Sequence, residues 1–291
     1  MAKKILVVGG TGMLGQPVVR RLLKDNYDVR VMTHSPVKAR KIFDDRVECI
    51  EGDVTNIASL EAPLSGCEAV YINLGAKMNP VDYERIEYQG TANIVKAARA
   101  GEVGQIGMIS GLTVKAGKDD VDFIKWKAKA EKALIESGIP YTIFRCCWFF
   151  ESLPLFVVKN QATLFGKQPH KRAWIAASDY AGMVSRAFDN SKALDKIFHV
   201  KGIDKYSISE ALDKFCSIAY PTAKSSRIPL WLASVLVKFS SKGAMRGIVD
   251  FMKYFDKTPD PETANDSEGI LGPALTTLED WAREYKMLLG Q

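Results

Sequence analysis

The stretch that decides the fold is KKILVVGGTGMLG, residues 3–15 of a 291-residue chain. Its apolar run, Ile5 to Val8, has the length and β-branched content of a buried parallel strand. The run enters a glycine-rich turn, and apolar residues then recur at helical spacing at Met13, Leu14, Val18, Val19, Leu22 and Leu23. The sequence therefore predicts a strand, a tight turn and a helix in direct succession.

The three glycines of this turn are spaced G-x-x-G-x-x-G. Gly9 permits the tight turn, Gly12 lets the backbone approach a pyrophosphate, and Gly15 lets the helix lie close to the strand. Such a turn can also be a plain connector, but the flanking strand and helix are the context that a phosphate-binding turn needs. We therefore expect the pyrophosphate of a dinucleotide to bind at Gly9, Thr11, Gly12, Met13, Leu14 and Gly15.

Composition is that of an ordinary soluble protein, with 47% hydrophobic and 25% charged residues. The net charge of +6 is spread along the chain, which argues against nucleic acid as a partner and suits an anionic cofactor. Five cysteines, without a C-x-x-C pair or a histidine cluster, favour reduced thiols and no metal. With no signal-peptide pattern, and with its longest later apolar stretch, Ile228 to Val237, too short to span a bilayer, we expect a cytoplasmic protein.

Strand and helix patterns alternate through the first half of the chain. Strands are expected at Asp28 to Thr33, Val47 to Gly52, Ala69 to Leu74, Ile106 to Ser110 and Tyr141 to Cys146. Helices are expected around Ala58 to Leu64, Asp82 to Ala100 and Asp122 to Ser137. This order predicts an α/β fold with a doubly wound parallel sheet, a Rossmann fold.

The end of the second strand bears on the choice of cofactor. An NAD-binding unit would place an Asp or Glu about 20 residues past the glycines to bond the ribose hydroxyls. Here the chain reads Thr33-His34-Ser35-Pro36, followed by Lys38 and Arg40, so there is no acid and several side chains could bind a phosphate. The missing acid favours NADP(H), which we expect to be held in part by His34, Ser35 and Lys38; alternatively, Lys38 and Arg40 form a solvated helix face.

Further candidates stand where other strands end. Asp53 and Val54 would lie near an adenine, and Asp53 is alternatively a turn or helix-capping carboxylate. Asn73 and Gly75 follow the fourth strand on the cofactor side, and Ser110 ends the fifth.

Several motifs together resemble the atypical short-chain dehydrogenase/reductase superfamily, and within it the NmrA-like branch that includes isoflavone-reductase-like and triphenylmethane-reductase-like proteins. They are GGTGMLG (9–15), GDVTNIASL (52–60), GTANIVKAA (90–98), MISG (108–111), ESGIPYTIFR (136–145), WFFESL (148–153) and WIAASDYA (174–181). The resemblance implies an NAD(P)-binding Rossmann domain over residues 1–150. It also implies a smaller, mostly helical substrate lobe over 151–291, with segments near 174–200 returning to the sheet.

One departure from the superfamily pattern matters for chemistry. Classical members use Tyr-x-x-x-Lys, whereas this chain has Phe123-x-x-x-Lys127, so the phenolic proton donor is absent. The resemblance implies that Lys127 bonds the nicotinamide ribose and acts in catalysis with Ser110 or a water as proton donor. Lys127 could alternatively be one of several solvated lysines, and the branch includes regulators that catalyse nothing. The expected function is therefore an NADPH-dependent reductase of an apolar carbonyl, enone or quinone-like molecule, or else a non-catalytic NADP(H) sensor.

The second lobe begins with a run of aromatic residues. Phe123, Trp148, Phe149 and Phe150 are expected to line an apolar substrate pocket, although aromatic residues after a strand are also typical of a core. Ile197 to Val200 is expected as an edge strand, Ser207 to Ala219 and Pro229 to Phe255 as helices, Thr258 to Gly272 as a loop and Leu278 to Leu289 as a final helix. Residues 229–255 mix apolar side chains with Lys238, Lys242, Arg246 and Lys253, which suits a membrane surface, a protein partner or a helical cap on the lobe.

Overall fold

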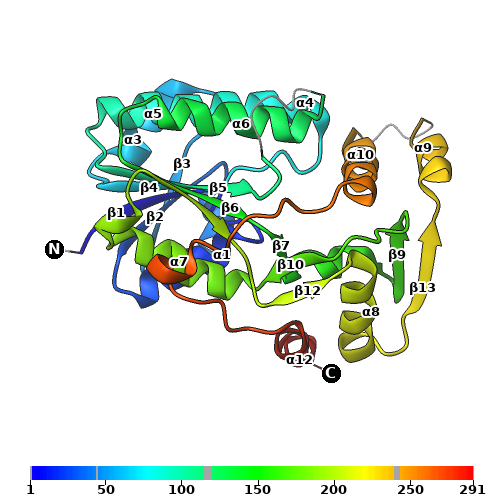
Figure 1. Ribbon diagram of the computed structural model, residues 1–291. Coiled ribbons are helices and arrows are strands. Elements are labelled where there is room, and N and C mark those ends of the chain that lie inside the picture. Colours follow the sequence, from blue (N-terminus) through cyan, green and yellow to red (C-terminus); the bar gives the residue numbers. More distant parts are fainter. Residues whose placement is uncertain (1, 44, 115–119, 239–242, 291) are drawn as a thin grey trace.

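A seven-stranded parallel sheet forms the centre of the computed structural model, which describes residues 2–43, 45–114, 120–238 and 243–290 (Figure 1). The strand order is β11-β6-β5-β4-β1-β2-β3. The strands are β1 (Lys4–Val8), β2 (Asp28–Thr33), β3 (Val47–Glu51), β4 (Ala69–Ile72), β5 (Gln105–Gly111), β6 (Tyr141–Cys146) and β11 (Lys196–Val200). The doubly wound Rossmann fold expected from the sequence is confirmed, and the edge strand near residues 197–200 is β11.

Helices cover both faces of this sheet. On one face lie α3 (Glu61–Leu64), α5 (Gly90–Ala100) and α6 (Asp122–Ile135), and on the other α1 (Gly15–Lys24) and α7 (Ala177–Phe188). Alternate residues of β1 enter the two cores, because Ile5 and Val7 pack toward α1 and α7 while Leu6 and Val8 pack toward α5 and α6. The apolar run at the start of the chain is therefore buried on both sides, as a central parallel strand should be.

The long helix expected over residues 82–100 is divided into three segments. It begins as α4 (Pro80–Asp82), continues as a π-helix, η2 (Tyr83–Gln89), and ends as α5. A π-helical stretch changes the direction in which side chains leave the helix, and such stretches are frequent at functional sites. In this chain the π-helix carries Glu87, whose position is described below.

The smaller lobe lies beside the carboxyl edge of the large sheet (Figure 1). It contains two three-stranded sheets, built from β7 (Trp148–Phe149), β10 (Arg172–Ile175) and β12 (Asp204–Tyr206), and from β8 (Val157–Val158), β9 (Gln161–Phe165) and β13 (Lys224–Ile228). Its helices are α8 (Ile208–Ala219), α9 (Leu230–Lys238), α10 (Gly243–Lys257) and α12 (Leu278–Leu288), and α11 (Glu268–Leu271) interrupts the expected loop 258–272. Within the segment 174–200, β10 pairs with β7 and β12 outside the large sheet, whereas α7 and β11 belong to the Rossmann side.

Two further points concern the helices of this lobe. Lys242, one of the basic residues noted in the sequence, lies outside the described residues. Across the part of the chain that is described, no helix combines the length and the apolar character needed to cross a bilayer.

Candidate functional site

The site lies where the strand order reverses, between β1 and β4. The glycine turn follows β1, and the loop after β4 begins at Asn73, whose backbone N–H donates to the Val8 carbonyl oxygen at 3.0 Å. The Asn73 Nδ2 amide also donates to the Gly9 carbonyl oxygen at 3.5 Å. In open α/β sheets, ligands bind outside the carboxyl ends of the strands at such a reversal.

Each glycine of the turn has a distinct surrounding. Gly9 has a φ of +78°, and a Cβ there would lie 2.2 Å from the Asn73 carbonyl oxygen. A Cβ on Gly15 would lie 2.2 Å from the Gly9 carbonyl oxygen, whereas a Cβ on Gly12 would meet only that oxygen, at 3.3 Å. Helix α1 begins without a side-chain cap or an acidic residue in its first turn. These features fit a pyrophosphate, because the helix N-terminus offers its N–H groups and the surface over Gly12 is open.

The residues expected near the adenosine half of the cofactor lie at the ends of β2 and β3. His34, Lys38 and Arg40 are exposed, and Ser35 precedes the short helix α2 (Pro36–Ala39). Asp53 Oδ1 accepts hydrogen bonds from the Thr55 backbone N–H and hydroxyl, both at 2.8 Å. The Thr55 backbone hydrogen bond, more than any other contact, lowers the pKa of Asp53, and the charge of His34 acts in the same direction. Asp53 therefore holds the turn after β3, and His34 lies near it.

Val54 and Gly75 flank this region differently. The Val54 side chain is buried, and its carbonyl oxygen accepts a hydrogen bond from the Asn93 amide at 2.9 Å, which ties the loop after β3 to α5. Nothing lies within 4 Å of a Cβ built on Gly75, so this part of the loop after β4 is open.

Lys127 occupies the centre of a buried polar cluster. Its Nζ lies 2.8 Å from Glu87 Oε2 and donates to the Leu74 carbonyl oxygen at 3.2 Å. The other carboxylate oxygen of Glu87 accepts from the Ala76 backbone N–H at 2.9 Å. The Lys127 and Glu87 side chains are 15% and 8% exposed, so Lys127 is not a solvated surface lysine. Sequence reasoning missed Glu87, which the π-helix aims at the loop after β4.

Ser110 belongs to a second buried cluster one helical turn further along α6. Its hydroxyl donates to Glu131 Oε1 at 2.5 Å, and Arg145 holds the same carboxylate through Nε and a terminal nitrogen at 3.1 and 2.6 Å. Because the Ser110 proton points to Glu131, it is engaged within the protein. Glu131 and Arg145 were also missed, although Glu131 stands four residues after Lys127 and shares its helix face.

The loop after β4 carries backbone strain and is covered by the smaller lobe. Lys77 and Met78 both have positive φ, +48° and +59°. A Cβ on Gly247 of α10 would lie only 1.7 Å from the Met78 carbonyl oxygen, so the helix and the loop meet backbone to backbone. Strain of this kind persists where surrounding structure enforces it, and it clusters at functional sites.

An aromatic cluster joins the two lobes beside Lys127. The Phe123 ring packs on Phe251, Tyr254 and Phe255 of α10, with ring centroids 5.0, 5.5 and 6.0 Å apart. Trp148 packs on Phe251 and Phe255 at 5.6 and 5.1 Å. Two of the four expected pocket residues, Phe123 and Trp148, are therefore brought together, and α10 supplies three more rings that the sequence did not identify.

Phe149 and Phe150 are core residues, contrary to the expected lining. Phe149 packs on Tyr180 at 5.3 Å beneath the large sheet, and Phe150 is fully buried against Trp174 and Trp281 in the core of the smaller lobe. Trp148 and Phe149 are successive residues of β7 and point to opposite sides, and Phe150 begins the 3-10 helix Phe150–Phe156, so the two phenylalanines enter different cores.

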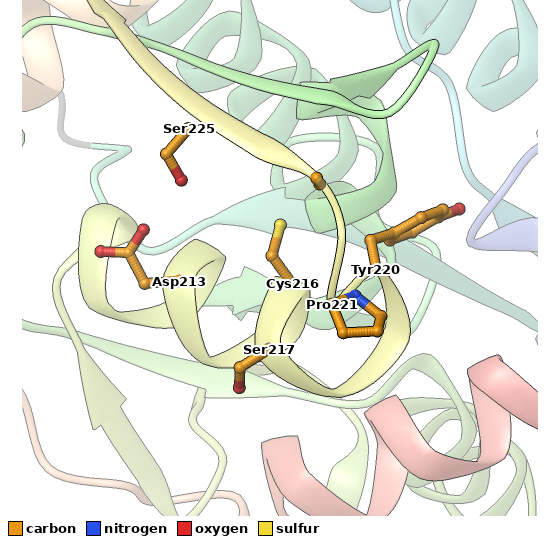
Figure 2. A pocket seen from close by; sticks show the side chains of 7 residues that line it. Asp213, Cys216, Ser217, Tyr220, Pro221 and Ser225 are labelled. Carbon is orange, nitrogen blue, oxygen red and sulfur yellow. The ribbon is translucent and has the colours of Figure 1, made fainter.

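A separate pocket of about 260 Å³ lies in the smaller lobe between α8 and β13 (Figure 2). Cys216 lines it together with Asp213, Ser217, Tyr220, Pro221, Ala223 and Ser225. Burial raises the pKa of the Cys216 thiol to about 11, so the thiol is a poor nucleophile near neutral pH. The lining has no basic side chain to bind the phosphates of a dinucleotide, so this pocket does not suit the cofactor.

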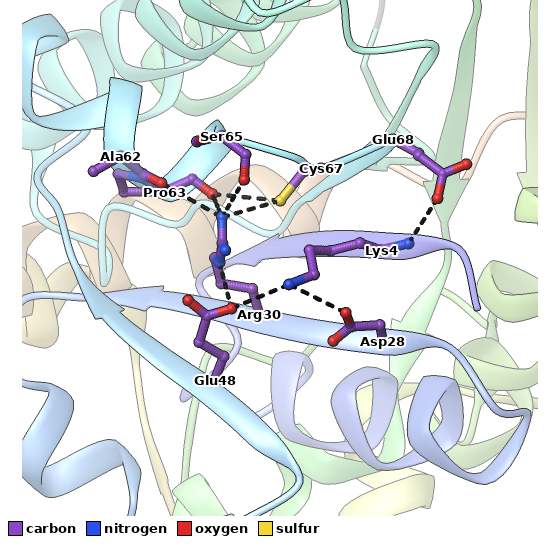
Figure 3. Close-up of polar contacts among 9 residues, drawn as sticks. All are labelled: Lys4, Asp28, Arg30, Glu48, Ala62, Pro63, Ser65, Cys67 and Glu68. Carbon is purple, nitrogen blue, oxygen red and sulfur yellow. Dashed lines mark hydrogen bonds and ion pairs between the residues drawn. The ribbon is translucent and has the colours of Figure 1, made fainter. Parts of the chain in front are cut away.

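A network of charges marks the opposite, amino edge of the large sheet (Figure 3). Arg30 pairs with Glu48 at 2.8 Å and donates to the carbonyl oxygens of Pro63 and Ser65 at 2.8 and 2.7 Å. Lys4 lies 3.1 Å from Asp28 and 3.4 Å from Glu48. These contacts tie β1, β2, β3 and the turn after α3 together, and their role is structural because they lie away from the carboxyl edge.

Comparison with known proteins gives a consistent picture. A family model described as NAD(P)H-binding matches residues 9–190. The photosystem II assembly factor Ycf39 of Trieres chinensis is 25% identical over 237 residues, 80% of this chain and 74% of that protein. Among solved structures, Citrobacter sp. triphenylmethane reductase complexed with NADP(H) has a TM-score of 0.76 at 16% identity, over 97% of this chain and 99% of that one. The NADPH-dependent quinone oxidoreductase QOR2 of Escherichia coli, complexed with NADPH, has a TM-score of 0.74 at 20% identity, over the same shares. At these identities the solved structures show a shared fold.

Proposed function

Because the chain belongs to the NAD(P)H-binding family, we propose that it is an NADPH-dependent reductase of a flat, apolar carbonyl, enone or quinone-like compound. The family match supports a nicotinamide cofactor, as the resemblance to the NmrA-like branch implies. One observation carries the proposal further. The buried Lys127 lies beside the aromatic cluster at the carboxyl edge of the sheet, because Lys127 and Phe123 share one face of α6.

In this proposal, different residues bind different parts of the cofactor. The glycine turn and the start of α1 hold the pyrophosphate, and His34, Ser35 and Lys38 favour the extra phosphate of NADPH over NADH. Lys127 exchanges a bond to the Leu74 carbonyl oxygen or to Glu87 for the ribose hydroxyls, and so orients the nicotinamide. When bound, the cofactor supplies a hydride.

The acceptor lies on the aromatic cluster that joins the two lobes. Phe123, Trp148 and Phe251 offer flat apolar faces that bind a conjugated ring and exclude water from the reacting atoms. Addition of a hydride to a quinone or carbonyl places negative charge on its oxygen, which then takes one proton. Phe123 has no proton to give, the Ser110 hydroxyl donates to Glu131, and burial raises the pKa of the nearby Tyr83 and Tyr254 phenols, so a water molecule supplies that proton.

A second candidate function is a cofactor-dependent regulator without turnover. It rests on the lack of a good proton donor beside Lys127 among the side chains that the structure describes. Beside Lys127 the Glu87 carboxylate is ion-paired, and burial raises the pKa of the Tyr83 and Tyr254 phenols that pack on Phe123, so these groups are poor proton donors. A relative at 25% identity is named as an assembly factor, which is a binding function. In this alternative, bound NADPH and NADP⁺ differ in how they order the loop after β4.

Oxidation of NADPH by the purified full chain tests the proposal. Calorimetric titration with NADPH and NADH comes first, followed by turnover with a panel of benzoquinones, naphthoquinones, enones and triphenylmethane dyes. Gly12→Val serves as the control that should bind no cofactor. Steady turnover with part of the panel supports the reductase, whereas binding without turnover across the panel supports the regulator. Absence of NADPH binding by the wild-type chain contradicts both functions.

A further inference from the structure

The outward face of α9 is apolar and is exposed in the part of the chain that the structure describes. Ala233 is buried and seats the helix on the lobe, while Trp231, Val235 and Leu236 are 70%, 44% and 54% exposed. Trp231 and Val235 are four residues apart and share a face, and Lys238 follows one turn later on the same side. A surface helix normally presents polar side chains to water, so the apolar outer face of α9 needs a partner that covers it.

Positive charge flanks this face at both ends. At the start of α9 lies a pocket of about 330 Å³ whose lining includes Lys167, Arg227 and Trp231, and Lys238 ends the helix. The carboxylate in the lining, Asp256, is engaged by the backbone N–H groups of Lys167 and Gln168 at 2.8 and 2.6 Å. The two cations of the lining outnumber its one carboxylate, beside an exposed tryptophan.

We propose that the outer face of α9 docks on an anionic phospholipid surface. Trp231, Val235 and Leu236 would enter the interface between headgroups and acyl chains, and Lys167, Arg227 and Lys238 would meet the phosphates. A short helix with an apolar face, an interfacial tryptophan and basic ends is suited to lie in the plane of a membrane. The overall charge of +6 adds attraction to an anionic surface at longer range.

The charge pattern favours lipid over a second copy of this chain. In a twofold symmetric pair, identical faces meet, so the two α9 helices would be either parallel or antiparallel. The first arrangement places Lys238 against Lys238, and the second places Lys238 against Lys167 and Arg227, so both oppose like charges. Arg227 lies 4.0 Å from Asp213, which offsets part of its charge, so Lys167 and Lys238 carry most of the positive charge around this face.

Vesicle sedimentation of the full chain tests this docking surface. We expect binding to vesicles of mixed phosphatidylglycerol and phosphatidylcholine, weak binding to phosphatidylcholine alone, and release by high salt. Leu236→Glu should weaken binding about tenfold or more, the effect of losing one inserted Leu side chain. Leu288→Glu is the matched control, because Leu288 is an 81% exposed leucine near the end of α12 and its change should leave binding intact.

A spectroscopic measurement locates the contact on the helix. Trp231→Phe keeps the apolar character, so binding should persist, and the emission difference between wild type and this variant should shift to the blue when anionic vesicles are added. The proposal is overturned if the chain does not sediment with anionic vesicles, or if Leu236→Glu and Leu288→Glu behave alike while both melt as wild type. Self-association that Leu236→Glu abolishes in the absence of lipid would assign the face to a second copy instead.

Discussion

Replacement of Lys127 by methionine separates the structural and functional roles of the buried ion pair. The substitution keeps the length of the side chain and removes its charge, which leaves the Glu87 carboxylate buried with one remaining hydrogen bond, from the Ala76 N–H. At the observed separation of 2.8 Å, Coulomb attraction in an effective dielectric of about 20 is roughly 6 kcal/mol before desolvation is subtracted. Loss of one partner of a buried pair costs about 3–5 kcal/mol, and the surviving hydrogen bond places Lys127→Met near the lower value.

This loss predicts a melting temperature about 6 °C or more below that of wild type. Lys132→Met is the matched control on the same helix, because Lys132 and its partner Glu136 are 72% and 64% exposed at 3.7 Å. An exposed pair of that kind contributes about 0–1 kcal/mol, so this control should melt close to wild type. Equal melting temperatures for the two variants would refute the assignment of a stabilising buried pair.

The double variant Lys127→Met/Glu87→Gln isolates the functional role. The glutamine amide oxygen can still accept from the Ala76 N–H, and no charge remains buried, so most of the lost stability should return. If Lys127 orients the nicotinamide, the double variant should bind NADPH about tenfold more weakly, the contribution of one charge-assisted hydrogen bond. In a reductase its turnover should fall about 10²-fold, the effect of a small displacement of the reacting groups. A stable double variant with wild-type affinity and turnover would show that the active site has been placed wrongly.

Three further predictions concern the turn, the cofactor and the amino edge of the sheet. Gly12→Val should abolish NADPH binding in calorimetry with little change in melting temperature, whereas Gly15→Val should destabilise the fold because its Cβ would lie 2.2 Å from a carbonyl oxygen. NADPH should bind more tightly than NADH by about 1–3 kcal/mol, and Lys38→Glu should reduce that difference; equal affinities in wild type would contradict the NADP assignment. Burial opposes ionisation of Glu48, but Arg30 and Lys4 outweigh it and lower its pKa below the usual 4.5. The contribution of Glu48 to stability is therefore complete above pH 4.5 and lost as pH falls through the lower folded-state pKa, so Glu48→Gln should flatten the acid side of a plot of melting temperature against pH.

The central sheet could be predicted because its signals are local. Strands β2 and β6 begin and end at the residues that the alternation of apolar side chains indicates, and the helices start and stop at recognisable residues. The glycine turn could also be predicted, because its glycines are regularly spaced directly after β1. The structure accounts for them by the contacts of Gly9 with Asn73 and of Gly15 with Gly9. The signals that predict these elements lie in consecutive residues of the sequence.

The polar clusters of the site could not be predicted in the same way. Glu87 meets Lys127 across 40 positions of sequence, and only the π-helix, which no periodicity indicated, aims it there. The pairing of Ser110 with Glu131 depends likewise on how α6 packs over β5. In the aromatic run, Trp148, Phe149 and Phe150 are all large aromatic residues. Only the fold of β7 and of the 3-10 helix after it decides that Trp148 faces the cluster with α10 while Phe149 and Phe150 enter separate cores.

The loop after β4 connects the two candidate functions. Three elements distant in sequence hold it: Lys127 of α6 binds the Leu74 carbonyl oxygen, Glu87 of the π-helix binds the Ala76 N–H, and α10 packs against Met78 through Gly247. A ribose that takes a hydrogen bond from Lys127 competes with Leu74 and Glu87 for the same ammonium group. Cofactor binding would thereby change the support of a strained loop that α10 of the smaller lobe touches directly. In a reductase this coupling closes the aromatic site over the acceptor, and in a regulator it would carry the cofactor's presence to the surface of the second lobe.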